Sequence, residues 1–176
     1  MKLEGESTWV VSIGDGGTFP LFVRDALGIS TGESGSVPRL TPPVPRLTDV
    51  EVPGIEHGWD RWWAESASTG FGHEPLGIPV RLHEAYTRWR NPLAPENTRR
   101  RDHLRSTFSD VLKELLADLE QELGRKPLFT LDISQLPVEG QFWRRLNRAK
   151  VLASEELMGS RNVIAPLESV IRDLVR

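Results

Sequence analysis

The residues best suited to chemistry are His57, His73 and His83, which lie within 27 residues of one another and near acidic side chains. Imidazole is a common transition-metal ligand and a general base near neutral pH. A metal-binding helix usually places two histidines four residues apart, whereas glycine and proline separate these three. The three histidines are therefore weak candidates for a small hydrolase site, with or without a metal ion.

Other catalytic signatures find little support in the sequence. The chain has no cysteine, which excludes thiolate nucleophiles and cysteine-ligated metal centres. The segment from Gly14 to Gly17 lacks the Lys-Ser/Thr ending of a phosphate-binding loop, so it predicts a tight turn instead. The segment from Gly32 to Gly35 has its glycines at the wrong offset for a serine nucleophile. The sequence assigns no catalytic residue and no cofactor, which favours a protein that is not an enzyme.

A strongly basic stretch offers a different kind of function. The segment from Arg81 to Arg105 contains seven arginines and three carboxylates. The rest of the chain is acidic, and the net charge of the whole chain is −3. Arginines crowd the start of a predicted helix and acidic residues its end, so both groups oppose the helix dipole. One interpretation is intramolecular pairing with acidic loops, another is a docking surface, and a third is a later helix start that leaves the arginines in a loop. The predicted partner-binding residues are Arg88, Arg90, Arg99, Arg100, Arg101, Arg105, Trp59 and Trp89.

From these observations we favour a bacterial binding or regulatory protein. Its partner would be a protein with an acidic surface, which docks on the Arg81–Arg105 region and the tryptophan-bearing segment before it. The first alternative is the histidine hydrolase. The second is nucleic-acid binding through the arginines, which predicts an affinity that falls steeply with salt.

The elements that must position these residues begin with one long helix. Apolar residues recur from Leu104 to Leu123 at helical spacing and predict an amphipathic helix over 99–123, which Gly124 ends. A second amphipathic helix is predicted after Ser160 or Asn162, close to the end of the sequence. Two shorter helices are predicted earlier, one over 56–65 and one over 80–90.

The tryptophans of the first short helix share one face. Trp59, Trp62 and Trp63 are spaced by three and four residues, which is typical of a helix that faces the core. The same aromatic face could also serve as a ligand platform. Tyr86, Trp89 and Trp143 would extend that platform if they converge on it.

Strands are predicted where β-branched and aromatic residues gather. Segments 7–13 and 18–24 predict an N-terminal hairpin across the glycine turn. Segment 128–133 predicts another strand. Segment 150–154 is either a strand paired with it or the tail of a helix, and we favour the strand. A helical turn is predicted over 142–146.

These elements suggest one α+β domain over 1–176, with the long and C-terminal helices packed on a small antiparallel sheet. Residues 28–53 are rich in proline, glycine and serine and predict an extended strap within it. No apolar run approaches the length needed to cross a bilayer, and no secretory signal is evident. We therefore expect a soluble, cytoplasmic protein with no membrane partner.

Overall fold

A computed structural model describes most of the 176 residues. The described backbone covers residues 2–5, 8–15, 17–32, 34–69, 74–75, 77–91 and 94–176. Within these ranges, the side chains of residues 2–5, 15, 34, 94–98, 100, 101 and 105 are not described.

The described strands form one mixed sheet of five in the order β1-β2-β3-β5-β4. The α+β class is confirmed, but the predicted antiparallel sheet needs correction. The three central strands β2, β3 and β5 run parallel, and only the outer pairs β1–β2 and β4–β5 are antiparallel. The strands are β1 Lys2–Gly5, β2 Trp9–Asp15, β3 Phe129–Leu136, β4 Trp143–Asn147 and β5 Lys150–Ser154.

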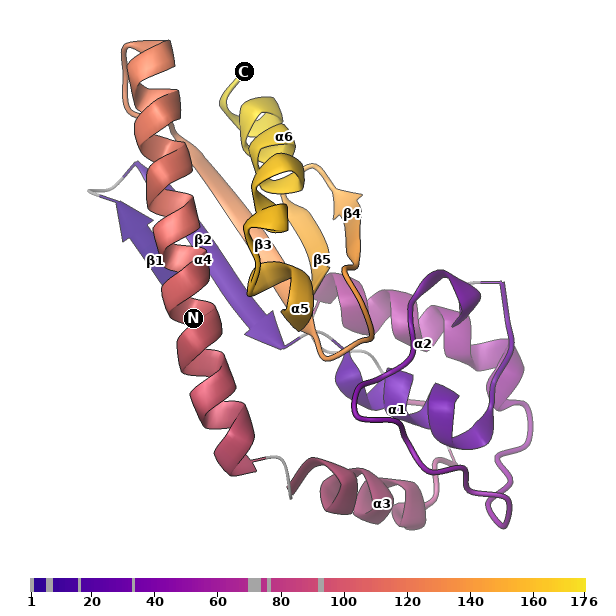
Figure 1. Cartoon of the computed structure of the whole chain (residues 1–176). Helices are drawn as coiled ribbons and strands as arrows, with labels where there is room; N and C mark the ends of the chain where they lie inside the picture. Colours follow the sequence, from indigo (N-terminus) through magenta and orange to yellow (C-terminus); the bar gives the residue numbers. More distant parts are fainter. Residues whose placement is uncertain are drawn as a thin grey trace.

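The long helix explains the parallel pairing. Helix α4, Ala94–Leu123, runs back along the sheet, so β3 starts at the same end as β2 (Figure 1). Helices α4 and α6, Ile164–Val175, pack on the sheet, as predicted, and both lie on the same face of it (Figure 1). The apolar stripe of α4 is buried from Leu104 onward, and from Phe108 it shares one core cluster with residues of β2, β3 and β5. Helix α4 ends before Gly124, whose φ of 63° provides the predicted left-handed stop.

An antiparallel strand pair is present near the N-terminus, as predicted, but the predicted second strand over 18–24 is wrong. Strand β1 pairs with β2, while segment 18–24 lies in helix α1, Thr18–Leu27. Pro20 is the third residue of α1, where the missing N–H costs little because first-turn amides lack helical partners. The side chains from Pro20 to Ala26 are buried in succession, so no polar face reveals the helical period.

A second apolar cluster lies at the carboxyl end of the parallel strands. It joins α1, the strap, α2 (Ile55–Thr69) and α3 (Val80–Arg90) to Leu136 and Leu152 of the sheet (Figure 1). The two short helices predicted over 56–65 and 80–90 are thus confirmed. Trp59, Trp62 and Trp63 are all buried, which supports the interpretation of this face as core.

The strap, residues 28–53, has little regular structure where its backbone is described. Its described part contains one short 3-10 turn, η1 Ser34–Ser36, and a bridge from Leu40 to Val138. Segment 150–154 is a strand paired with β3, as favoured, whereas the helical turn predicted over 142–146 is wrong because β4 occupies it. Short helices α5 (Glu155–Met158) and η3 (Arg161–Val163) precede α6. None of the described helices is long and apolar enough to cross a membrane.

Candidate docking surface

The C-terminal turn of α3 presents two of the predicted arginines to solvent. Arg88 and Arg90 are exposed, and their position at the end of a helix complements its dipole. Arg88 Nε donates to the Glu84 carbonyl oxygen at 3.3 Å, and Arg90 lies 5.9 Å from the Tyr86 ring centroid. These contacts orient the two side chains, and the contact of Arg88 with a backbone carbonyl leaves its charge unneutralised by any described carboxylate.

A short connection leads from α3 to α4, so the end of one helix lies close to the start of the other (Figure 1). Arg99 is exposed on α4. The helix begins at Ala94 and not at Arg99, which places Arg99 beyond the first turn. The predicted conflict with the dipole is weaker there, because the dipole effect falls off within that turn. The side chains of Arg100, Arg101 and Arg105 lie outside the described set.

Two carboxylates in the acidic half of α4 pair with arginines near the C-terminal end of the sequence. Arg161 lies 2.7 Å from Glu114, and Arg172 hydrogen-bonds both carboxylate oxygens of Glu122 at 2.7 and 2.8 Å. The hydrogen bond from Arg172 lowers the pKa of Glu122. These ion pairs account for carboxylates that the helix dipole alone would disfavour.

In the basic stretch from Arg81 to Arg105, ion pairs account for the charge of fewer residues. Arg81 forms an ion pair with Asp49 of the strap. By contrast, no carboxylate among the described residues lies within ion-pair distance of Arg88 or Arg99. The two arginines therefore carry exposed charge that this part of the chain does not neutralise.

The two tryptophans predicted to contact a partner differ in exposure. Trp59 is fully buried, stacks on Trp63 at 6.0 Å and donates from Nε1 to the Pro20 carbonyl oxygen at 2.8 Å. Its side chain belongs to the core, so we leave it out of the surface. Trp89 is half-buried, and its Nε1 donates to the Pro42 carbonyl oxygen at 3.2 Å.

The two candidate histidines that the structure describes, His57 and His83, do not lie together. His57 is exposed on the first turn of α2 and lines a pocket with Leu27, the last residue of α1. His83 stacks on Phe19 at 4.5 Å, near the start of α1, and its Nε2 lies 2.9 Å from Glu74 Oε1. His73 lies outside the described residues. Within the described part of the chain, no three ligating side chains form a metal site.

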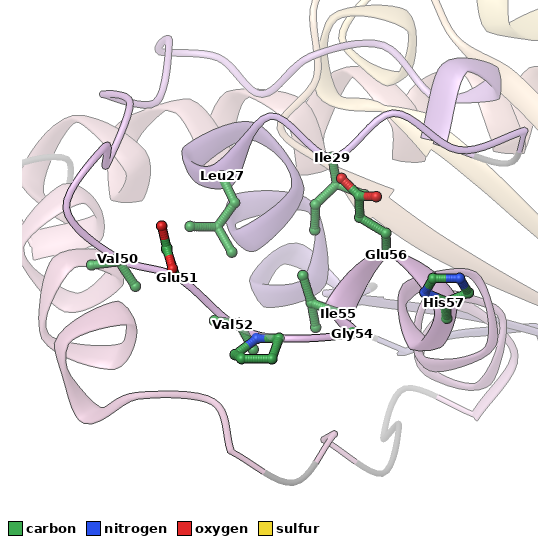
Figure 2. Close-up of a pocket in the computed structure, with 10 residues that line it drawn as sticks. Leu27, Ile29, Val50, Glu51, Val52, Gly54, Ile55, Glu56 and His57 are labelled. Atoms are coloured by element: carbon green, nitrogen blue, oxygen red, sulfur yellow. The ribbon is translucent and has the colours of Figure 1, made fainter.

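The pocket beside His57 has a volume of about 430 Å³ (Figure 2). Apolar side chains form much of its lining, including Leu27, Ile29 and Ile55. Two carboxylates, Glu51 and Glu56, also border it. The pocket thus combines apolar side chains with two exposed carboxylates, and no sequence pattern indicated it.

Sequence reasoning also missed a buried ion pair. Arg24 and Asp25 are adjacent in α1, both about 4% exposed, and Arg24 Nε donates to Asp25 Oδ1 at 2.8 Å. Arg24 also donates to the Val37 and Pro38 carbonyl oxygens of the strap at 2.6 and 2.8 Å. The sequence does contain one signal for this pair: Arg24 and Asp25 stand together inside an apolar run. Charged residues are rarely fully buried unless they are paired, so two opposite charges in such a run indicate a buried ion pair.

Comparison with known proteins does not add to this description. No family model matches the chain, and neither the curated proteins nor the solved structures contain a significant match.

Proposed function

We propose that this chain is a binding protein that docks an acidic segment of a partner protein on the α3–α4 basic surface, defined by Arg88, Arg90 and Arg99. The observation that supports it most is the exposed charge of Arg88 and Arg99, for which the described residues offer no carboxylate. Two carboxylates in the acidic half of α4, Glu114 and Glu122, in contrast have arginine partners within the chain.

The chemistry of arginine supports a carboxylate-bearing partner. The planar guanidinium can hold a carboxylate by two parallel hydrogen bonds, and it keeps its charge at any physiological pH. Each exposed contact contributes only about 0.2–1 kcal/mol, so several are needed for useful affinity. Clustered positive charge also speeds the encounter with an acidic surface.

An acidic protein is favoured over nucleic acid because of the charge on the rest of the molecule. The net charge of the chain is −3 although the basic stretch is positive. The same helix that carries Arg99 also carries exposed carboxylates such as Asp118 and Glu120. A long polyphosphate would meet these charges, whereas a short acidic peptide segment would not.

Fluorescence anisotropy with a labelled oligoglutamate peptide tests the proposal at low salt. Reversal of two charges, Arg88→Glu with Arg99→Glu, should weaken binding by about tenfold, since each replaces an attraction with a repulsion. The matched control is Arg61→Glu on α2, an arginine that is 86% exposed and pairs with Glu65. It should leave the affinity within about twofold.

Two results would contradict the proposal. One is the absence of saturable binding to the wild-type chain, and the other is an equal loss in the double variant and the Arg61 control. Labelled duplex DNA serves as a parallel probe. Tighter binding to DNA than to oligoglutamate, with a steep salt dependence, would support the nucleic-acid alternative instead.

The remaining expectations have less support. The positions of His57 and His83, at opposite ends of α1, do not support a hydrolase site. The hydrolase site stays a prediction because His73 lies outside the described residues. A cytoplasmic location belongs to the same proposal and is consistent with the absence of cysteine.

A further inference from the structure

A cleft of about 340 Å³ lies between the end of α1 and the strap. This volume falls at the lower end of the range for small-molecule sites. The lining combines arginines, one aspartate, one serine, two glycines and apolar residues. The lining residues include Arg24, Asp25, Gly28, Ser30, Arg39 and Arg46.

The cleft carries an excess of positive charge. Three arginines, Arg24, Arg39 and Arg46, line it together with one carboxylate, that of Asp25. Asp25 Oδ1 accepts from Arg24 Nε at 2.8 Å, and Oδ2 accepts from the Leu40 backbone N–H at 2.8 Å. The buried pair is thus internally neutral, and the charges of Arg39 and Arg46 are left at the rim.

Arg39 is well placed to meet a ligand. Its side chain is 70% exposed, and the nearest carboxylate oxygen among the described side chains, Asp25 Oδ1, lies 3.7 Å away, within ion-pair distance but beyond hydrogen-bond distance. Since Asp25 already has two closer partners, Arg39 keeps its donors for a second anion.

Arg46 lies across the end of α1 and is held there by the backbone. Its NH1 donates to the Asp25 carbonyl oxygen at 3.1 Å. Its guanidinium packs so closely on Gly28 that a Cβ there would lie 1.8 Å from NH1. Gly28 also has a φ of 71°, a left-handed conformation that favours glycine.

Hydrogen bonds partly compensate the negative end of the α1 dipole at this cleft. Arg24 O accepts from Gly28 N at 2.8 Å, and Ala26 O accepts from Leu47 N at 2.9 Å. Together with the bond from Arg46 to Asp25 O, these contacts compensate the partial negative charge at the helix end.

We propose that this cleft binds a small molecule through a multiply charged oxyanion, either a phosphate or a polycarboxylate, held by Arg39 and Arg46. Two guanidinium groups match a dianion better than a monoanion, because each can supply paired donors to anionic oxygens. The Ser30 hydroxyl at the same cleft adds a neutral donor. This inference is independent of the proposed docking surface.

Isothermal titration calorimetry of the full chain tests the cleft with pyrophosphate in one arm and citrate in the other. At least one probe should bind saturably, and the tighter one identifies the oxyanion class. Arg39→Gln should weaken that binding by about tenfold or more, because a charge-assisted hydrogen bond to the anion is lost. Arg46→Gln should do the same.

The control is Arg61→Gln, a change of equal chemistry on the exposed side of α2, which should leave the affinity unchanged. Circular dichroism confirms that each variant is folded. Should Arg46→Gln fail to fold, Arg39→Gln decides the outcome, because its exposed side chain makes no closer contact with Asp25 than 3.7 Å. No saturable binding of either probe, or binding unchanged in Arg39→Gln, would overturn the proposal.

Discussion

Arg172 of α6 donates two hydrogen bonds to the carboxylate of Glu122 of α4, from NH1 at 2.8 Å and from NH2 at 2.7 Å. The same guanidinium donates from Nε to Glu168 at 2.8 Å, one turn away on its own helix. The two helices that cover the sheet are thereby joined by charge as well as by their apolar faces. Charge that opposes the dipole of one helix is matched by a residue on its neighbour.

This pair predicts a specific loss of stability in acid. The hydrogen bond from Arg172 lowers the pKa of Glu122 below its usual 4.5, so the folded state binds the proton less tightly than the unfolded state. The contribution of the pair is present above the unfolded pKa and is lost as pH falls through the folded pKa. Glu122→Gln should therefore lower the melting temperature at neutral pH and approach the wild-type value near about pH 3.

Thermal melts from about pH 7 to about pH 3 measure this effect. The matched control is Glu120→Gln, two positions earlier on the same helix, where the carboxylate is exposed and makes no ion pair with a described side chain. Its acid profile should parallel that of the wild type. A constant offset between Glu122→Gln and the wild type across the whole range would show that the carboxylate charge is not what holds the pair.

Removal of the buried carboxylate should be far more costly. Asp25→Ala leaves the Arg24 guanidinium buried without its counter-charge and the Leu40 N–H without its acceptor. Breaking a buried pair in this way costs about 3–5 kcal/mol of unfolding free energy. Urea denaturation followed by tryptophan fluorescence gives the value, and cleavage of the strap by a protease at low concentration should quicken in parallel.

Asp49→Ala provides the comparison for that experiment. Asp49 also pairs with an arginine, Arg81, but both side chains are more than half exposed. Its removal should cost no more than about 1 kcal/mol. Equal losses for the two variants would mean that burial of Asp25 adds nothing to the stability of the strap.

Two glycines predict opposite effects of the same substitution. Gly58 lies inside α2 with open space where a Cβ would be, so Gly58→Ala should stabilise the protein by about 0.5–1 kcal/mol. Gly17 has a φ of 56°, and a Cβ there would lie 2.8 Å from the Trp63 ring. Gly17→Ala should destabilise the protein by about 1–3 kcal/mol. Chemical denaturation measures both, and a shared sign would refute the assigned geometry at one of them.

Sequence reasoning succeeded where one periodic signal was strong. The stripe of α4 needed only the spacing of its leucines, and Gly124 marked its end. Helices α2 and α3 followed from the same reasoning, because each has one apolar and one polar face. These signals are local, so a single sequence contains them.

The errors come from segments whose structure depends on distant contacts. Helix α1 is buried through most of its length and rich in β-branched and aromatic residues, so its local preference resembles a strand. The parallel pairing of β2 with β3 depends on how α4 crosses the sheet, which no local pattern records. The arginine-lined cleft likewise arises from α1 and the strap only after they pack together. The positions of Arg88 and Arg99 on exposed helix faces, in contrast, could be predicted from helical spacing.

The order of strands also constrains how the chain acquires its fold. Trp9 of β2 aligns with Phe129 of β3. These partners are about 120 positions apart, so their pairing must close a long loop before it gains any contact, which slows folding. During synthesis β2 leaves the ribosome long before β3 exists. The backbone hydrogen-bonding groups on the β3 side of β2 stay unpaired during that time. A nascent chain halted between these strands should therefore be prone to aggregation.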